Sequence, residues 1–150
     1  MVSFRTNSEA ETVAFGERMA GLIEPRAGLQ IGLSGPLGSG KTRLVKGLLY
    51  GFGLGRDVTV QSPTYVFYRR YPGRAVPLFH FDFYRLSGAE DLEEIDLSEA
   101  LQEGIVVMEW ADRVKGKMPP LDYDIRLSYG EKTDERLIEV LGPEAFLKRL

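Results

Sequence analysis

The sequence predicts an α/β fold in which a mixed, mainly parallel sheet with antiparallel additions is flanked by helices. Two apolar runs, residues 29–34 and 105–108, have the length and character of buried parallel strands. After a glycine-rich loop, the first run is followed by a stretch of helical period, residues 44–52. Near the C-terminus, residues 125–128 and 136–141 flank a short polar turn and indicate an antiparallel pair.

The other elements follow from capping, periodicity and turn residues. Ser8 and Glu11 form a capping box that begins a helix over residues 9–23. Further strands are expected at residues 58–61, 66–71 and 75–83, the last two joined by a turn at Pro72-Gly73. The remaining predicted helices are an acidic helix over residues 88–103 and a short tail helix over residues 143–150.

Composition narrows the class of protein. The length of 150 residues predicts one domain, residues 1–150, and 43% hydrophobic with 27% charged residues is typical of a globular protein. The absence of cysteine excludes disulfides, a thiolate metal site and a cysteine nucleophile. No apolar run approaches the roughly 20 residues of a membrane span, and the first residues lack a signal-peptide core. We therefore expect a cytoplasmic protein that does not associate with membranes.

The glycine-rich loop carries the most specific signal in the sequence. Its residues, Gly35-Pro-Leu-Gly38-Ser39-Gly40-Lys41-Thr42, match the P-loop pattern G-x-x-x-x-G-K-[ST] at every position. The glycines let successive backbone N–H groups point at one cluster of phosphate oxygens, at the positive end of the following helix. Lys41 is expected to reach the β and γ phosphates, and the Thr42 hydroxyl to ligate Mg²⁺. The chain is thus predicted to be a single P-loop NTPase domain that binds Mg-ATP.

Two acids are candidates for the carboxylate that such a site needs beside Mg²⁺. Glu109 follows the apolar run Ile105-Val-Val-Met, and Asp82 ends the run Val76-Pro-Leu-Phe-His-Phe. For both, a solvated carboxylate at a strand end is the alternative. His80, the only histidine, should share a strand face with Asp82, and we favour a packed, hydrogen-bonded side chain over a functional one. Residues 61–64 form either a plain turn or a switch-like loop whose hydroxyls, such as that of Thr64, sense the γ-phosphate.

Several motifs in order resemble the TsaE (YjeE) family, the small ATPase of the bacterial machinery that makes threonylcarbamoyladenosine in tRNA. They are the leading helix with Ser8-Glu-Ala-Glu-Thr12, the P-loop, Ser62-Pro-Thr-Tyr65, His80-Phe-Asp-Phe-Tyr-Arg-Leu86 and Glu109-Trp110, and they extend over residues 5–141. The resemblance implies a single-domain P-loop fold and slow ATP hydrolysis stimulated by partner proteins. It also implies association with the TsaB–TsaD heterodimer, with tRNA contacted through the complex.

The resemblance also implies roles for individual residues. Glu109 stands at the Mg²⁺ end of its strand, Asp82 lies near the γ-phosphate as a metal ligand or water-orienting group, and Thr64 is a switch-loop hydroxyl. Thr12 and its helix are implied to lie near the nucleotide base. Arg43 stands where many members of the family carry a second hydroxyl residue, which puts a second hydroxyl contact there in doubt.

A small-molecule kinase that transfers the γ-phosphate to an acceptor is the alternative function. A kinase usually needs a mobile lid with arginines, for which the chain after the P-loop helix leaves little room. No [NT]-K-x-D stretch for reading guanine is present, so ATP is favoured over GTP. Strand alternation would place Arg85, the nearest arginine, on the face opposite Asp82. The site is therefore expected to depend on a partner for rapid turnover.

Overall fold

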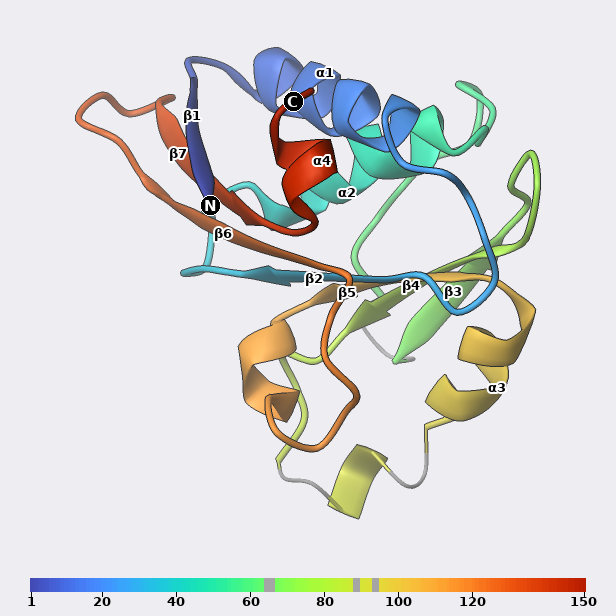
Figure 1. Ribbon diagram of the computed structural model, residues 1–150. Helices are drawn as coiled ribbons and strands as arrows, with labels where there is room; N and C mark the ends of the chain where they lie inside the picture. The colour runs from blue at the N-terminus through green and yellow to red at the C-terminus, as the bar shows by residue number, and fades with distance from the viewer. Residues whose placement is uncertain (64–66, 88–89, 93–94) are drawn as a thin grey trace.

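The computed structural model describes residues 1–63, 67–87, 90–92 and 95–150. A seven-stranded sheet lies between two layers of helices (Figure 1), with the strand order β1-β7-β6-β2-β5-β4-β3. The strands are β1 (Val2–Thr6), β2 (Gln30–Ser34), β3 (Tyr68–Tyr71), β4 (Leu78–Asp82), β5 (Ile105–Glu109), β6 (Tyr123–Tyr129) and β7 (Arg136–Leu141). Strands β6, β2, β5 and β4 are parallel, and antiparallel strands extend the sheet at both edges. The predicted fold class is confirmed.

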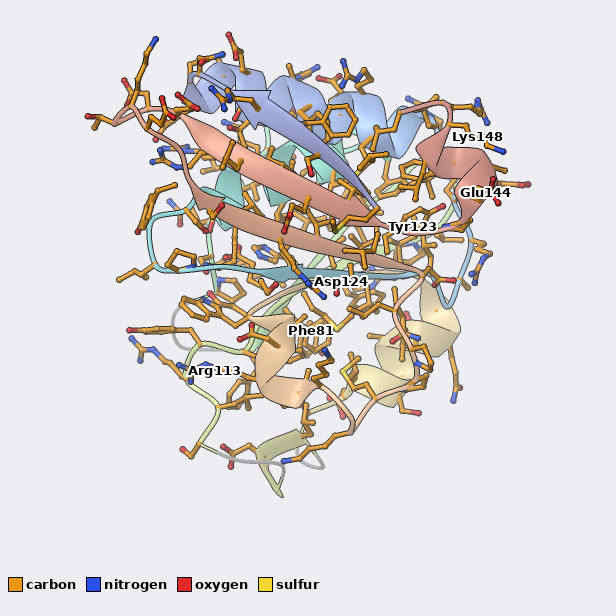
Figure 2. All side chains as sticks on the ribbon, turned by 60° about the vertical axis from the view of Figure 1, so that its left-hand side comes forward. Phe81, Arg113, Tyr123, Asp124, Glu144 and Lys148 are labelled. Atoms are coloured by element: carbon orange, nitrogen blue, oxygen red, sulfur yellow. The ribbon has the colours of Figure 1, made fainter. Side chains whose placement is uncertain are left out.

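Each face of the sheet has its own apolar core. One face carries α1 (Glu9–Gly21), α2 (Lys41–Gly51) and α4 (Glu144–Leu147), and the other carries α3 (Leu97–Glu103) with the short 3-10 helices η1 (Glu90–Leu92) and η2 (Ala111–Val114) (Figure 1). Figure 2 shows Tyr123 on the side of α4 and Phe81 on the opposite side, in agreement with their membership of separate buried clusters. Within the described ranges, the helices lack the length and apolar character needed to cross a bilayer.

The strand predictions were wrong at two places, both near sheet edges. Strand β1 was not expected from the sequence, and it forms because Val2 and Phe4 pack on the core while the strand pairs with β7. Residues 58–61 were expected to be a strand but are not, and the sheet ends at β3 without them. Edge strands depend on pairing more than on their own residues, so local sequence is least informative there.

The helix predictions were right for α1, α2 and the tail helix, but too long for the acidic helix. Ser8 accepts a hydrogen bond from the Glu11 N–H at 3.1 Å, as predicted, whereas the Glu11 carboxylate accepts from the Asn7 N–H at 2.7 Å and not from Ser8. Of residues 88–103, α3 takes only Leu97–Glu103, and residues 88–89 and 93–94 lie outside the described part. Ile95 and Leu97 are both buried in the same core. Residues two positions apart do not lie on one face of a helix, so a single helix could not place both of them there.

Close contact between α1 and α2 positions the helix that follows the P-loop. A Cβ atom on Gly47 would lie 2.0 Å from the Val13 carbonyl oxygen, and one on Gly16 would lie 2.5 Å from the Leu44 carbonyl oxygen. The two backbones therefore approach each other through glycines on both helices. Because α2 begins at Lys41, this contact determines where the P-loop ends in space.

We predict that Gly47→Ala destabilises the protein by about 1–3 kcal/mol, because the added methyl group overpacks the helix contact and outweighs the better helix propensity of alanine. Urea unfolding followed by circular dichroism measures the change. Gly21→Ala is the matched control, since a Cβ there meets no atom within 4 Å, and it should leave stability unchanged or raise it. Equal stability of both variants would contradict the close approach of α1 and α2.

Candidate functional site

The site forms where three parallel strands end at one edge of the sheet. Strand β2 leads into the loop of residues 35–40, and the neighbouring strands β5 and β4 end at Glu109 and Asp82. In the ladder, Leu33 is paired with Glu109, and Glu109 with Asp82. Carboxyl ends of parallel strands in an open α/β sheet are the usual place for a ligand. The structure therefore brings together the P-loop and both predicted acids.

Three glycines give the P-loop its curled backbone. Gly35, Gly38 and Gly40 have φ angles of 142°, 75° and 98°, which side chains of L residues rarely adopt. At Gly35 a Cβ would also lie 2.3 Å from the Leu127 carbonyl oxygen, so strand β6 touches the start of the loop. Ser39 donates its N–H to the Pro36 carbonyl at 3.1 Å and its hydroxyl is buried, without a partner in the described part of the chain.

Lys41 is folded back onto its own loop. Its ammonium donates to the carbonyl oxygens of Gly35 at 2.6 Å and Pro36 at 3.0 Å, and it lies 3.9 Å from the centroid of the Trp110 ring. Burial lowers the pKa of Lys41, and the negative charges of Glu109, Asp82 and Asp112 oppose that shift. The loop carbonyls and the ring thus hold a cation at the place where phosphate oxygens are expected to bind.

Glu109 is buried and forms the centre of a hydrogen-bond network. Its side chain is only 4% exposed, and its oxygens lie 2.9 and 3.1 Å from the Thr42 hydroxyl, which donates to them. His80 Nε2 lies 2.8 Å from Glu109 Oε1 and carries the proton when the carboxylate is ionised. The solvated alternative for Glu109 is therefore wrong, and the packed, hydrogen-bonded reading of His80 is confirmed.

Asp82 anchors the loop that follows β4. One carboxylate oxygen accepts a hydrogen bond from the Ser62 hydroxyl, and the other accepts from the Tyr84 N–H at 2.9 Å. The Ser62 contact brings this residue to the site, whereas Thr64 lies outside the described residues. Both oxygens of Asp82 therefore have partners, as both oxygens of Glu109 do, and a new ligand on either acid needs a local change or a shared lone pair.

Trp110 has a role that the sequence did not indicate. It has a left-handed backbone, with φ 58°, which is uncommon for an aromatic residue and places its ring over Lys41. The ring also lies 5.0 Å from the Tyr84 ring and 5.3 Å from the Arg113 guanidinium. Arg113 in turn donates to the Tyr84 carbonyl at 2.6 Å, so the chain segments after β4 and β5 are joined. The Glu-Trp pair was the only sequence signal for this contact.

These groups surround a cavity of about 530 Å³. Its lining residues are Glu9, Leu37, Gly38, Gly40, Lys41, Thr42, Arg43, Ser62, Pro63, Phe67, Asp82, Tyr84, Arg85, Glu109 and Trp110. The prediction that Arg85 faces away from Asp82 was wrong: β4 ends at Asp82 and the chain turns, so strand alternation no longer applies. Thr12 lies beneath the loop, buried, with its hydroxyl 2.8 Å from that of Thr6.

Mg²⁺ suits the donors that converge here. It prefers oxygen ligands and usually keeps several waters, binding through one or two carboxylates and the phosphates of a nucleotide. The Thr42 hydroxyl and the Glu109 carboxylate already touch, and Asp82 is paired with Glu109 across the ladder. Among the described residues no cluster of three or more acidic or histidine side chains could hold a metal alone.

Fold and loop together define the P-loop NTPase class of fold. The chain superimposes on the crystal structure of Bacillus subtilis YdiB with a TM-score of 0.73 and 24% sequence identity. The match includes 98% of this chain and 89% of YdiB, and it shows a shared fold. The family model of threonylcarbamoyl adenosine biosynthesis protein TsaE matches residues 6–138, and the chain belongs to the TsaE family.

Curated relatives agree with this assignment. A tRNA threonylcarbamoyladenosine biosynthesis protein TsaE from Streptomyces coelicolor is 43% identical over 136 residues, which are 85% of this chain and 87% of the relative. A protein of the same name from Haemophilus influenzae is 31% identical, over 89% of this chain and 85% of the relative. The predicted resemblance to TsaE is confirmed over most of the chain.

We predict that Lys41→Ala weakens the binding of Mg-ATP by roughly 10- to 100-fold, because a charge-assisted contact of about 1.5–3 kcal/mol is lost. In the unmodified protein, movement of Lys41 from the ring to phosphate should change the fluorescence of Trp110, the single tryptophan. Titration by calorimetry and by fluorescence measures both effects. Lys46→Ala, on the same helix beside Tyr50, is the control and should bind normally. Unchanged affinity of the Lys41 variant would contradict the assignment of this loop as a phosphate-binding P-loop.

Proposed function

We propose that this chain binds Mg-ATP and hydrolyses it slowly, and that it serves threonylcarbamoyladenosine modification of tRNA together with the TsaB–TsaD heterodimer. The observation that carries the proposal is the contact of the P-loop hydroxyl of Thr42 with the buried carboxylate of Glu109. This pair joins the phosphate loop to an acid from a neighbouring strand, as Mg-nucleotide sites require. The relatives from Streptomyces coelicolor and Haemophilus influenzae are named for threonylcarbamoyladenosine biosynthesis in tRNA, which supports this role.

Binding begins with Lys41. Its ammonium leaves the carbonyls of Gly35 and Pro36 and turns to the β and γ phosphates, while the loop N–H groups and the start of α2 receive the remaining negative charge. Burial lowers the pKa of Lys41, and a phosphate partner would compensate for this loss of solvation. Thr42 and Glu109 would hold Mg²⁺, which when bound neutralises charge that develops on the phosphates.

Asp82 is the group best placed to orient the attacking water. It lies beside Glu109 on the next strand and lines the same cavity as the loop. Its oxygens are already bonded to Ser62 and to the Tyr84 N–H, so a local rearrangement or a shared lone pair is needed before it can hold water. Arg85 also lines the cavity and could approach the γ-phosphate if the turn after β4 moved.

This arrangement supports the proposed dependence on a partner. In the free chain Lys41 is bonded to its own loop and Asp82 to the two segments beside it, so the catalytic groups are held in a resting geometry. A surface that moves the segments carrying Ser62 and Tyr84 would release Asp82 and bring charge to the γ-phosphate. The TsaB–TsaD heterodimer is the proposed source of that surface.

We predict that Glu109→Ala lowers the single-turnover rate of ATP hydrolysis by more than 100-fold and affinity by less than 10-fold, because the acid acts through the metal and its waters. Rapid-quench measurements at saturating Mg-ATP give the rate. Glu103→Ala is a matched control, since Glu103 is exposed and paired only with Arg70 at 3.7 Å in the described structure. A normal rate for the Glu109 variant would mean that its carboxylate only supports Thr42 and His80.

We predict that phosphate release is slow for the isolated chain, below about one per second, and rises at least tenfold with TsaB–TsaD, because the partner completes the site. Steady-state phosphate release, with and without the heterodimer, measures this. Release of several phosphates per second by the chain alone, or no response to the heterodimer, would remove the partner from the proposal. Transfer of phosphate to a small-molecule acceptor instead of water would favour a kinase.

A further inference from the structure

Two side chains at the end of the β6–β7 hairpin reach across to the P-loop. Tyr129, the last residue of β6, donates its hydroxyl to the carbonyl oxygen of Leu37. Arg136, the first residue of β7, donates from Nη2 to the carbonyl oxygen of Gly38 at 3.3 Å. Two successive peptide units of the loop are therefore held by residues about a hundred positions away in the sequence.

Exposed residues at the loop tip make these hydrogen bonds more important. The Leu37 side chain is 67% exposed, so packing contributes little to holding the tip in place. Tyr129 is itself 52% exposed, and its position is not explained by burial of its ring. Glycine at position 38 has the widest backbone freedom, and a single well-defined conformation there needs restraint from outside the loop.

Holding a carbonyl oxygen also directs the neighbouring N–H group. The peptide bond is planar and trans, so its C=O and N–H point in opposite directions. When Tyr129 holds the Leu37 oxygen on the hairpin side, the Gly38 N–H is turned away from the hairpin. Arg136 holds the next peptide unit through the Gly38 oxygen, and the N–H of that unit, which belongs to Ser39, donates to the Pro36 carbonyl within the loop at 3.1 Å. Donors aligned before binding avoid the entropic cost of ordering a glycine-rich loop around phosphate.

The pair is rigid because each member is held by other contacts. Tyr129 and Arg136 are cross-strand neighbours in the ladder, and the guanidinium lies 5.4 Å from the centroid of the tyrosine ring. Arg136 Nη1 donates to the carbonyl oxygens of Thr133 at 2.7 Å and Glu135 at 2.8 Å. Glu135 is buried and lies 3.0 Å from Arg5 of β1, which fixes the hairpin end to the edge of the sheet.

We infer that Tyr129 and Arg136 are positioning residues, which act together to hold the P-loop in its phosphate-binding shape before a nucleotide arrives. The inference rests on the proposed binding of a nucleoside triphosphate by this loop. The pair touches loop carbonyls, so its effect on the ligand passes through the phosphate cradle and not through the base or sugar. Loss of the pair should therefore lower the affinity of the protein by the same factor for any ligand with the same phosphate chain.

The test compares Tyr129→Phe and Arg136→Met with Tyr50→Phe, a control on α2 where the ring contacts Lys46 and Arg56. Calorimetry measures the affinity of each protein for Mg-ATP and for inorganic tripolyphosphate with Mg²⁺. Loss of one loop hydrogen bond should weaken both ligands by the same factor, about 3- to 10-fold, in Tyr129→Phe and Arg136→Met. Thermal unfolding should show a Tm within about 2 °C of the unmodified protein for Tyr129→Phe.

Hydrogen exchange in the free protein provides a readout that does not require nucleotide. The amides of Gly38 and Ser39 should exchange at least threefold faster in Tyr129→Phe than in Tyr50→Phe, with other amides unchanged. Equal exchange together with unchanged affinity would overturn the inference, and so would loss of affinity for ATP but not for tripolyphosphate. If the unmodified protein binds neither ligand while the exchange effect is present, the proposed function fails and the restraint of the loop stands.

Discussion

The buried carboxylate of Glu109 is the group on which the site depends. A charge taken out of water is costly unless hydrogen bonds satisfy it, and here Thr42 and His80 do so from two other elements. Thr42 belongs to the helix after the P-loop, and His80 to the neighbouring strand β4. One acid therefore ties together the phosphate loop and two parallel strands, and any shift of these elements relative to one another would leave its charge without partners.

Close packing of the helix layer supports the same contact. The Thr42 hydroxyl can donate its hydrogen bond to Glu109 only if the first turn of α2 keeps a fixed distance from the sheet. Contact of α1 and α2 through Gly16 and Gly47 brings the two backbones together without intervening side chains. The three side chains Thr42, Asp82 and Glu109 thus stand on a helix and two strands, which support accurate placement.

The segments around the cavity are joined by weaker contacts, and these are the parts that a partner could move. Asp82 holds the segment of Ser62 and the turn at Tyr84, and Trp110 with Arg113 joins that turn to the end of β5. Lys41 sits between these contacts and the loop carbonyls. Since each link is one or two hydrogen bonds or ring contacts, a partner surface or a bound phosphate has enough binding energy to exchange them.

The sequence by itself determined the P-loop, the buried strands that end at the two acids, and the class of fold. These features are local, because the glycines, Lys41 and Thr42 are contiguous and a four-residue apolar run before Glu109 specifies a buried strand. It also predicted a packed His80, but not its partner. Only the tertiary structure decided that Arg85 shares the cavity with Asp82, that Trp110 covers Lys41, and that Tyr129 and Arg136 reach the loop. Such contacts depend on strand order and on turns, which bring together residues far apart in the chain, and the spacing of residues along it does not encode them.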